Sequence, residues 1–304
     1  MKYANLHLHS TYSDAGFTPL QLVLIGKSLG YYAMALTDHE TDGGVPEFFD
    51  AAKSEGLRSI AGAEFYGDAF GAHFHIVGLD FDRDHPALRA FIKARCDEMG
   101  ECTRRCFERG VALGHIKDAT WDDVLALSPP GTWICIDQVI RALRQKGVLA
   151  LAGGADELRK NCFKGEARAF FPKHPSAEEV IRVIRGAGGV AVLAHPYKQD
   201  QYVGKLVDLG LNGIEVSHPD LYENSARLAS EAADAYHLYR SGGTDHTGRS
   251  AVAAEITRFP HCRESPKRNI PYSPSEDSAD PERMNYYEKS KNRRVRSRTR
   301  QLVL

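Results

Sequence analysis

The chain changes from helix to strand at Leu29-Gly-Tyr-Tyr-Ala-Met-Ala-Leu-Thr-Asp-His39, where a short apolar run follows a glycine and ends on an acid and a histidine. The same pattern recurs at residues 56–64, 189–195, 210–218 and 238–246. Short, continuous apolar runs are typical of buried parallel strands, and their alternation with helical stretches indicates βαβ units. The sequence therefore predicts an α/β fold with ligand-type side chains at the carboxyl ends of its strands, where the active sites of such folds lie.

Two helix starts carry capping sequences. Thr18-Pro-Leu-Gln21 combines an N-cap threonine, a proline at the first helical position and a glutamine three residues after the cap, which predicts a helix over residues 20–29. Ser176-Ala-Glu-Glu179 predicts a second helix over residues 180–185, which the glycines of the following turn end. Both helices precede a predicted strand, as βαβ units require.

Between residues 85 and 174 the alternation stops. Leu88, Ile92 and Met99 follow helical spacing, residues 139–143 mark another helix, and no strand of comparable quality intervenes. We interpret residues 85–174 as a helical insertion that forms a lid or selects the substrate, placed between the body segments 1–84 and 175–258. The alternative is additional scaffold without contact to the substrate.

The composition bounds the remaining possibilities. With 42% hydrophobic and 26% charged residues, the 304-residue chain can bury a core, and wholesale disorder is excluded. No apolar run approaches the roughly 20 residues of a membrane span, and the N-terminus lacks the apolar stretch of a secretory signal. The six cysteines form no CxxC pair, so we interpret them as reduced thiols and expect a cytoplasmic protein.

Residues 259–304 are expected to form a polar, basic tail. Although the chain has a net charge of −1, residues 289–300 carry seven Lys and Arg and no acidic residue. A solvated tail is one interpretation, and an arm that attracts RNA is the other.

Histidines and acids dominate the predicted strand ends. In His7-Leu-His9 the two imidazoles lie on the same side of a strand, so both can reach one metal ion. Imidazole combined with carboxylate suits Zn, Mn or Fe, and burying so many ionisable groups together is costly without a cation. The sequence therefore predicts a site for more than one metal ion, with the candidate ligands His7, His9, Asp14, His39, Glu64, His75, His195, Asp245 and His246.

Six motifs resemble, in order, spacing and strand context, those of the PHP (polymerase and histidinol phosphatase) family of metal-dependent phosphoesterases. They are His7-Leu-His9-Ser-Thr-Tyr-Ser-Asp14, Leu36-Thr-Asp-His39, Gly62-Ala-Glu64, His75-Ile-Val-Gly-Leu79, Ala194-His-Pro196 and Gly243-Thr-Asp245. The resemblance covers residues 3–82 and 176–248. It implies a distorted seven-stranded (βα)7 TIM-like barrel, interrupted by the helical insertion, that holds two or three divalent metal ions.

The resemblance also implies roles for the ligands. His7, His9, Glu64 and Asp245 would hold one ion, and Glu64 would bridge to a second ion bound by His75 and His195. Asp14, His39 and a histidine beside Asp245 would hold a third. The family closes this motif with Asp-x-His, whereas this chain reads Asp245-His246-Thr247, so His246 reaches the cluster only if the chain turns beyond the strand, as neighbouring glycines allow.

The insertion resembles that of a PHP subgroup that acts on nucleotides and short RNA ends. In that subgroup an Arg-Pro-His element is expected, and here Trp133-Ile-Cys-Ile-Asp137 stands in its place. Nucleotide specificity therefore does not follow from this resemblance.

The predicted activity is hydrolysis of a phosphate ester, either a phosphomonoester such as a nucleotide or a short oligonucleotide such as RNA. Two ions would activate a water for attack at phosphorus, with Glu64 bridging them and Asp38 orienting a ligating histidine. His218 is predicted to protonate the leaving alcohol or bind phosphate, or else only to cap the turn before Pro219. Candidate phosphate contacts are Lys164, Arg168 and Lys198.

Two further functions stay open at the level of sequence. One is a histidinol-phosphate-type phosphatase, which the large insertion makes less attractive. The other is a non-catalytic, metal-stabilised module that binds nucleic acid or a protein, against which the complete ligand set argues. For the predicted phosphate-ester hydrolase and for the histidinol-phosphate-type phosphatase, the partner is a small phosphorylated substrate. No membrane partner is expected in any of these cases.

Overall fold

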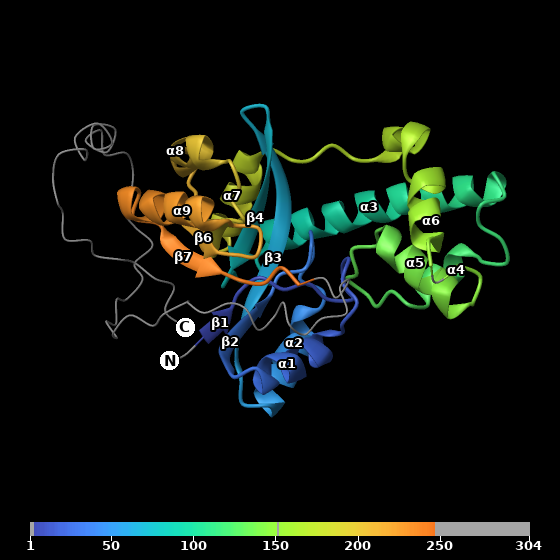
Figure 1. Ribbon diagram of the computed structural model, residues 1–304, viewed down its shortest axis with the longest axis horizontal. Coiled ribbons are helices and arrows are strands. Elements are labelled where there is room, and N and C mark those ends of the chain that lie inside the picture. Colours follow the sequence, from blue (N-terminus) through green and yellow to red (C-terminus); the bar gives the residue numbers. More distant parts are fainter. Residues whose placement is uncertain (1–2, 151, 247–304) are drawn as a thin grey trace.

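The computed structural model describes residues 3–150 and 152–246 (Figure 1). The predicted polar tail, Cys262 and the last residues of the second body segment lie outside the described residues. The described strands and helices follow one another as β1 (Tyr3–Asn5), α1 (Pro19–Ser28), β2 (Tyr31–Leu36), α2 (Val45–Ser54), β3 (Arg58–Ala69), β4 (Ala72–Leu79), α3 (Pro86–Ala112), α4 (Trp121–Leu125), α5 (Ile136–Gln145), α6 (Gly154–Cys162), η1 (Gly165–Phe170), α7 (Ala177–Gly186), β5 (Val190–Leu193), η2 (Asp200–Tyr202), α8 (Val203–Asp208), β6 (Gly213–Ser217), α9 (Glu223–Ala235) and β7 (Tyr239–Gly242).

The strands form one seven-stranded sheet in the order of the sequence, β1 to β7. The pairs β1–β2, β2–β3, β5–β6 and β6–β7 are parallel. The predicted α/β class is therefore confirmed. Beyond the assigned strands, the Leu6 amide donates to the Gly242 carbonyl at 3.0 Å and the Asp245 amide to the His7 carbonyl at 2.9 Å, so the segments that follow β1 and β7 lie side by side.

Strand β4 corrects the prediction of parallel strands, because it pairs antiparallel with both β3 and β5. A two-residue turn joins β3 to β4, and Phe70 and Gly71 both have positive φ, at 54° and 74°. Positive φ at both central residues is typical of the type I′ turn, whose twist matches a tight hairpin. The sequence offers a glycine at only one of these two positions, so it does not show this hairpin.

The predicted helix starts are confirmed, with slightly different bounds. The Thr18 hydroxyl accepts from the Gln21 amide while the Gln21 side chain accepts from the Thr18 amide, and helix α1 begins at Pro19. At α7 the Ser176 hydroxyl accepts from the Glu179 amide at 3.1 Å, and the helix begins at Ala177.

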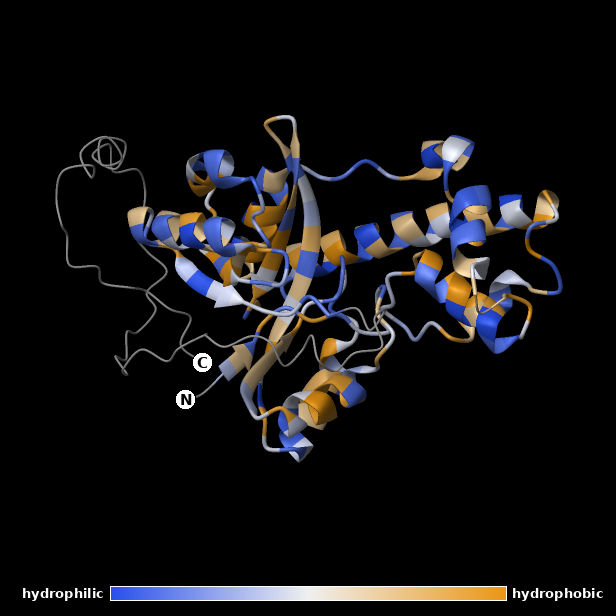
Figure 2. Cartoon of the chain, viewed as in Figure 1, coloured by the Kyte–Doolittle hydropathy of each residue, from blue (hydrophilic) through white to orange (hydrophobic). Residues whose placement is uncertain are grey.

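Hydrophobic residues lie on both sides of the sheet. Leu6, Ala35 and Val192 belong to a cluster supplied by segments from four different parts of the sheet, which shows that the sheet curves around this core. On the other side, α7, α8 and α9 pack against the strands through a larger cluster that includes Phe65, Ile181 and Ile214. Figure 2 shows α7 largely in the hydrophobic colours, whereas α3 alternates along its length and β7 is blue to white.

Helices α3 to α6 and η1 follow β4 and precede β5, and they share a hydrophobic cluster of their own. Helix α3 runs out from the sheet, and α4, α5 and α6 gather toward its far end (Figure 1). Helix α5 also reaches back: the Arg141 guanidinium donates to the Thr11 and Ala15 carbonyls at 3.1 and 2.8 Å, and the Gln138 amide donates to the Ser13 carbonyl. The insertion thus holds the loop that follows β1.

Two smaller predictions concern cysteines and membranes. The five cysteines within the described residues are free thiols. Over the same residues, no helix combines the length and apolar character needed to cross a membrane.

Candidate metal centre

The predicted ligands meet at one end of the sheet. His7 and His9 follow β1, His39 follows β2, His195 follows β5 and Asp245 follows β7. Two further ligands correct the expectation that every ligand lies at a strand end: Glu64 lies within β3 and His75 within β4. Glu64 joins the others because β3 continues past the end of β2 and pairs beside His39. His75 joins them because β4 runs antiparallel, so its first half lies at the end where the parallel strands finish.

Glu64 occupies the middle of this group and is fully buried. One carboxylate oxygen, Oε1, lies 3.0 Å from Nδ1 of His75 and 3.2 Å from Nε2 of His195. The other oxygen, Oε2, lies 3.0 to 3.4 Å from ring nitrogens of three further histidines, which are His7, His9 and His39. The two oxygens therefore face two separate sets of imidazoles, which is the arrangement expected of a carboxylate between two ions.

Several sets of ligand atoms lie within 4.8 Å of one another. One set is His7, His9, Glu64 and Asp245, and another is His39, Glu64 and His75. A third set contains His9, Asp14 and His39. Their mixed nitrogen and oxygen donors suit a transition-metal ion.

Unpaired polar atoms test whether a cation fits here. Buried polar atoms normally have hydrogen-bond partners, yet His9 Nδ1 and Glu64 Oε2 make no hydrogen bond to any part of the chain that the structure describes. Glu64 Oε2 nevertheless has three ring nitrogens around it at 3.0 to 3.4 Å. Donor atoms that converge without hydrogen-bond geometry fit a shared cation.

Electrostatics lead to the same conclusion. Burial raises the pKa of Glu64, but the charges of His7 and His39 and the hydrogen bond from His195 outweigh it, so that the pKa of this carboxyl lies well below its usual value. Burial lowers the pKa of His9, yet its contacts with Asp245 and Glu64 raise it to about 10. The buried carboxylates keep their charge because imidazoles face them, and a bound cation would supply the same compensation in place of the imidazole protons.

His246 does not join the cluster. Its ring stacks on Phe17, with centroids 5.7 Å apart, and its backbone pairs with Leu8 beyond the end of β1. Asp245 has a positive φ of 49°, so the chain does turn after β7, yet the ring of His246 lies on Phe17 and His246 is in none of the groups of ligand atoms among the described residues. Asp14 and His39 remain together with His9 instead.

Asp38 is buried, and its carboxylate is hydrogen-bonded to two serines. Its carboxylate accepts from the Ser10 amide and hydroxyl, both at 2.6 Å, and from the Ser13 hydroxyl. These bonds fix the loop between His9 and Asp14 rather than an imidazole ring.

Glu215 is a residue that the sequence reasoning missed. Its Oε1 lies 3.0 Å from His7 Nδ1, and its Oε2 accepts from the His195 amide at 2.7 Å. Because a carboxylate only accepts, Nδ1 of His7 must carry the proton, which leaves Nε2 to face the cluster. The sequence signal for Glu215 was its position in the predicted strand that ends at His218.

His218 is buried beside the cluster. Its Nδ1 accepts from the Asp220 amide at 3.1 Å, so the neutral ring carries its proton on Nε2. That nitrogen lies 3.4 Å from Asp245 Oδ2. The capping role and the role at the site, which the sequence offered as alternatives, are therefore both compatible with its position.

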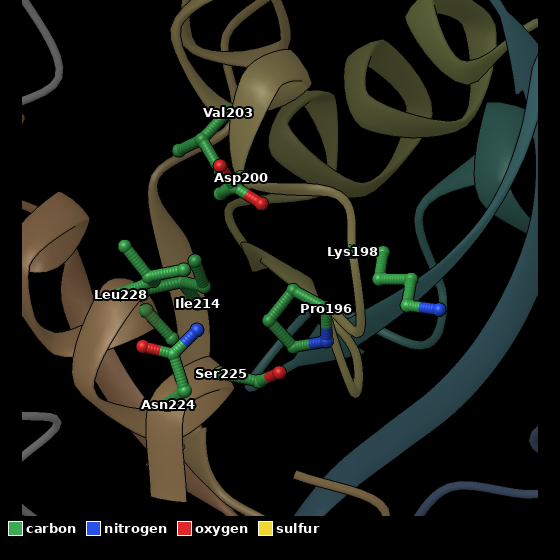
Figure 3. A pocket seen from close by; sticks show the side chains of 9 residues that line it. Pro196, Lys198, Asp200, Val203, Ile214, Asn224, Ser225 and Leu228 are labelled. Atoms are coloured by element: carbon green, nitrogen blue, oxygen red, sulfur yellow. The ribbon is translucent and has the colours of Figure 1, made fainter. Parts of the chain in front are cut away.

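The predicted phosphate contacts are scattered. Lys164 lines a cavity that also contains Asp14 and His39, whereas Arg168 is exposed on η1. Lys198 lines a small cavity of about 100 Å³ beyond β5, and its amine points away from Asn224 on the opposite wall (Figure 3). Lys164 thus shares a cavity with two residues of the cluster, Asp14 and His39.

An α/β sheet that gathers imidazoles and carboxylates around a buried, shared glutamate defines a metal-dependent hydrolase. A model of the PHP domain family matches residues 5–105. The 5′-3′ exoribonuclease Rnm of Salmonella typhimurium is 30% identical over 250 residues, which cover 79% of this chain and 84% of that protein. The chain belongs to the PHP family, and it is a hydrolytic phosphoesterase of that family.

Two further similarities extend over most of the chain. Phosphoribosyl 1,2-cyclic phosphate 1,2-diphosphodiesterase of Eggerthella lenta is 29% identical and covers 84% of this chain and 96% of its own length. A Bifidobacterium adolescentis protein solved as a candidate metal-dependent phosphoesterase superimposes with a TM-score of 0.68 at 26% identity, over 82% of this chain and 89% of its own. These relatives agree on phosphoester chemistry and differ in substrate.

Proposed function

We propose that this protein hydrolyses a phosphate ester of a nucleotide or of a short oligonucleotide. The observation that supports it best is the division of Glu64 between two sets of histidines, with Oε1 toward His75 and His195 and Oε2 toward the histidines that follow β1 and β2. Such a carboxylate suits a pair of ions, and paired ions are typical of phosphoester hydrolysis.

The ligands divide between two principal positions. His7, His9, Glu64 and Asp245 would hold one ion, and Glu64, His75 and His195 the second. Asp14 and His39, with His9 beside them, would hold a third ion without His246. Zn, Mn and Fe match these donors.

Bound ions would polarise the phosphate and lower the pKa of a water. The protein's own residues supply the orientation. Glu215 sets the tautomer of His7, and Asp38 holds the loop that carries Asp14. His218, whose neutral ring carries its proton on Nε2 and faces Asp245, would donate that N–H as a hydrogen bond to a phosphate oxygen and keep its proton.

The substrate proposal draws on the relatives. An exoribonuclease that covers most of the chain argues for phosphate esters of nucleotides. A histidinol-phosphate-type phosphatase is the second candidate. The insertion favours the nucleotide, because it adds aromatic residues next to the cluster: Tyr66 of β3 faces Trp133 of the insertion, with ring centroids 6.1 Å apart.

We propose that the chain consists of a body and an insertion. Residues 1–84 and 175–258 would form the body as a distorted (βα)7 barrel, which the hydrogen bonds from Leu6 to Gly242 and from Asp245 to His7 support. Residues 85–174 would form the insertion that selects the substrate.

A hydrolysis screen tests the proposed function. The protein is loaded separately with Mn, Zn and Fe(II) and offered adenosine 3′,5′-bisphosphate, a 5′-phosphorylated RNA tetramer, ribose 5-phosphate and histidinol phosphate. We expect phosphate or nucleotide release from the first two, and none from a Glu64→Ala control. Turnover of histidinol phosphate alone would favour the second candidate, and no turnover by metal-loaded protein would overturn both.

A further inference from the structure

A cavity of about 280 Å³ opens beside the metal centre, between the sheet and the helical insertion. Asp14 and His39 form its end toward the cluster. Four aromatic residues line it, from β3 (Tyr66), from the segment before α5 (Trp133) and from the segments around η1 (Phe163 and Phe171), together with aliphatic and polar residues of α3 and α5. The volume lies close to the lower limit for pockets that hold small molecules.

The aromatic rings adjoin the metal ligands directly. The ring of Tyr66 stacks on that of His39, with centroids 4.9 Å apart and planes inclined by 23°. Trp133 lies 5.7 Å from His39 and exposes only 6% of its surface, so the core of the insertion fixes the indole in place. A flat group in the cavity would meet rigid rings and lie next to the cluster.

Charged groups occupy the outer part of the cavity. Arg159 donates to Asp137 at 3.0 Å, and both line the cavity, so they offer donors and an acceptor to an occupant. Lys164 is exposed at the same cavity. The cavity thus combines aromatic walls with a few polar groups, which is the usual composition of a site for an amphipathic aromatic ligand.

We infer that this cavity binds the nucleobase of the nucleotide whose phosphate is hydrolysed, an inference that rests on the proposed function. In a nucleotide, one sugar separates the base from the phosphate. The cavity likewise places its aromatic side chains, which suit a base, next to the metal ligands, which suit the phosphate. Every base has a π face that can stack on an aromatic side chain, so such stacking does not depend on which base is bound. The relatives differ on this point, since one is named for RNA, whose nucleotides carry bases, and another for a phosphoribosyl cyclic phosphate.

Tryptophan fluorescence tests the inference independently of hydrolysis. The chain has two tryptophans; Trp133 lines the cavity, whereas Trp121 packs on Phe107 and lines a separate groove along α3. In metal-loaded Trp121→Phe protein, adenosine, which has no phosphate to lose, should quench the emission of Trp133 saturably. In Trp133→Phe protein it should leave the emission of Trp121 unchanged, and ribose 5-phosphate should quench neither.

Equal quenching of both tryptophans would overturn the inference. So would an unchanged emission of Trp133 at concentrations of adenosine monophosphate that inhibit hydrolysis of the substrate. Quenching without turnover of any substrate would instead support the base site and refute the proposed function.

A second pair of variants covers the case in which a tryptophan variant fails to fold. Phe171 and Phe70 are similarly exposed, at 41% and 45%, and only Phe171 lines the cavity. Phe171→Ala should raise KM for adenosine 3′,5′-bisphosphate roughly tenfold with little change in kcat, whereas Phe70→Ala should change neither. An unchanged KM in Phe171→Ala would count against stacking in this cavity.

Discussion

Glu64 is a carboxylate that the protein keeps charged although it is fully buried. Burial alone would favour the protonated acid, and the opposing histidines shift the balance toward the carboxylate. Hydrogen bonds to His75 and His195 fix one oxygen, which leaves the other to face His7, His9 and His39. A single residue therefore connects ligands from both halves of the chain.

Glu64→Ala should abolish metal binding and activity together, because both principal ion positions use this carboxylate. Asp38→Asn should keep most of the metal and slow turnover, since Asp38 bonds to Ser10 and Ser13 rather than to a ligand ring. Elemental analysis and turnover of the two purified variants check this difference. Equal metal loss in both would show that Asp38 acts on the ligands directly.

Glu215→Gln should lower metal affinity by about 10- to 100-fold, the usual effect of a changed partner behind a ligand. A glutamine has one acceptor oxygen, whereas Glu215 accepts from both His7 and His195. Metal titrations measure the effect, with Glu223→Gln on the exposed start of α9 as the matched control. The same affinity in both variants would contradict an orienting role.

At the scale of elements, the centre depends on segments held close together. β4 brings His75 to the end where the parallel strands finish, because it runs in the opposite direction. Helix α5 fixes the loop after β1 through Gln138 and Arg141. At Gly243 the chain passes so closely against the segment after β1 that an added Cβ would lie 2.3 Å from the Cβ of His7.

Gly243→Ala should therefore push the end of β7 away from His7, lower the free energy of unfolding by about 1–3 kcal/mol and weaken metal binding. Gly100→Ala, in the interior of α3 with no atom near the added Cβ, should instead raise it by about 0.5–1 kcal/mol. Urea unfolding and metal titration of both variants provide the test. Wild-type metal affinity in Gly243→Ala would show that the close approach does not shape the centre.

At the scale of the whole molecule, the ligands come from loops and strands spread from His7 to Asp245, so metal binding connects distant parts of the sequence. An ion present at 100 times its dissociation constant should stabilise the fold by about 2.7 kcal/mol if it binds only the folded state. Thermal unfolding with and without Mn measures this effect. A shift of the same size in Glu64→Ala would place the stabilising ion elsewhere.

The basic tail makes a separate prediction from charge alone, because it lies outside the described residues. If residues 289–300 attract RNA, removing residues 261–304 should reduce turnover of a short RNA at low salt and have little effect at high salt. Turnover of a mononucleotide should not change. Identical salt profiles for the full-length and shortened chains on RNA would leave the solvated tail as the explanation.

Much of the centre could be predicted from the sequence. The repeated apolar runs predicted the α/β class, and seven residues proposed as ligands from these patterns occur in sets of ligand atoms within 4.8 Å of one another: His7, His9, Asp14, His39, Glu64, His75 and Asp245. His195, the other strand-end candidate, lies 3.2 Å from Glu64. The side chains could be expected to lie close together because hydrophobic spacing reports burial, and because parallel strands finish at one edge whatever their order.

The tertiary structure alone decided the direction of β4, the place of His246 beside Phe17, the role of Glu215 and the aromatic cavity. Strand direction and contacts such as that between Glu215 and His7 join residues far apart in the chain, and local patterning carries no information on which distant partner a strand or carboxylate meets. The direction of a side chain such as that of His246 depends on the turn at Asp245, whose φ of 49° no sequence pattern predicts. The amino-acid sequence thus supplied the imidazoles and carboxylates of a metal centre, and packing selected which of these side chains meet in it.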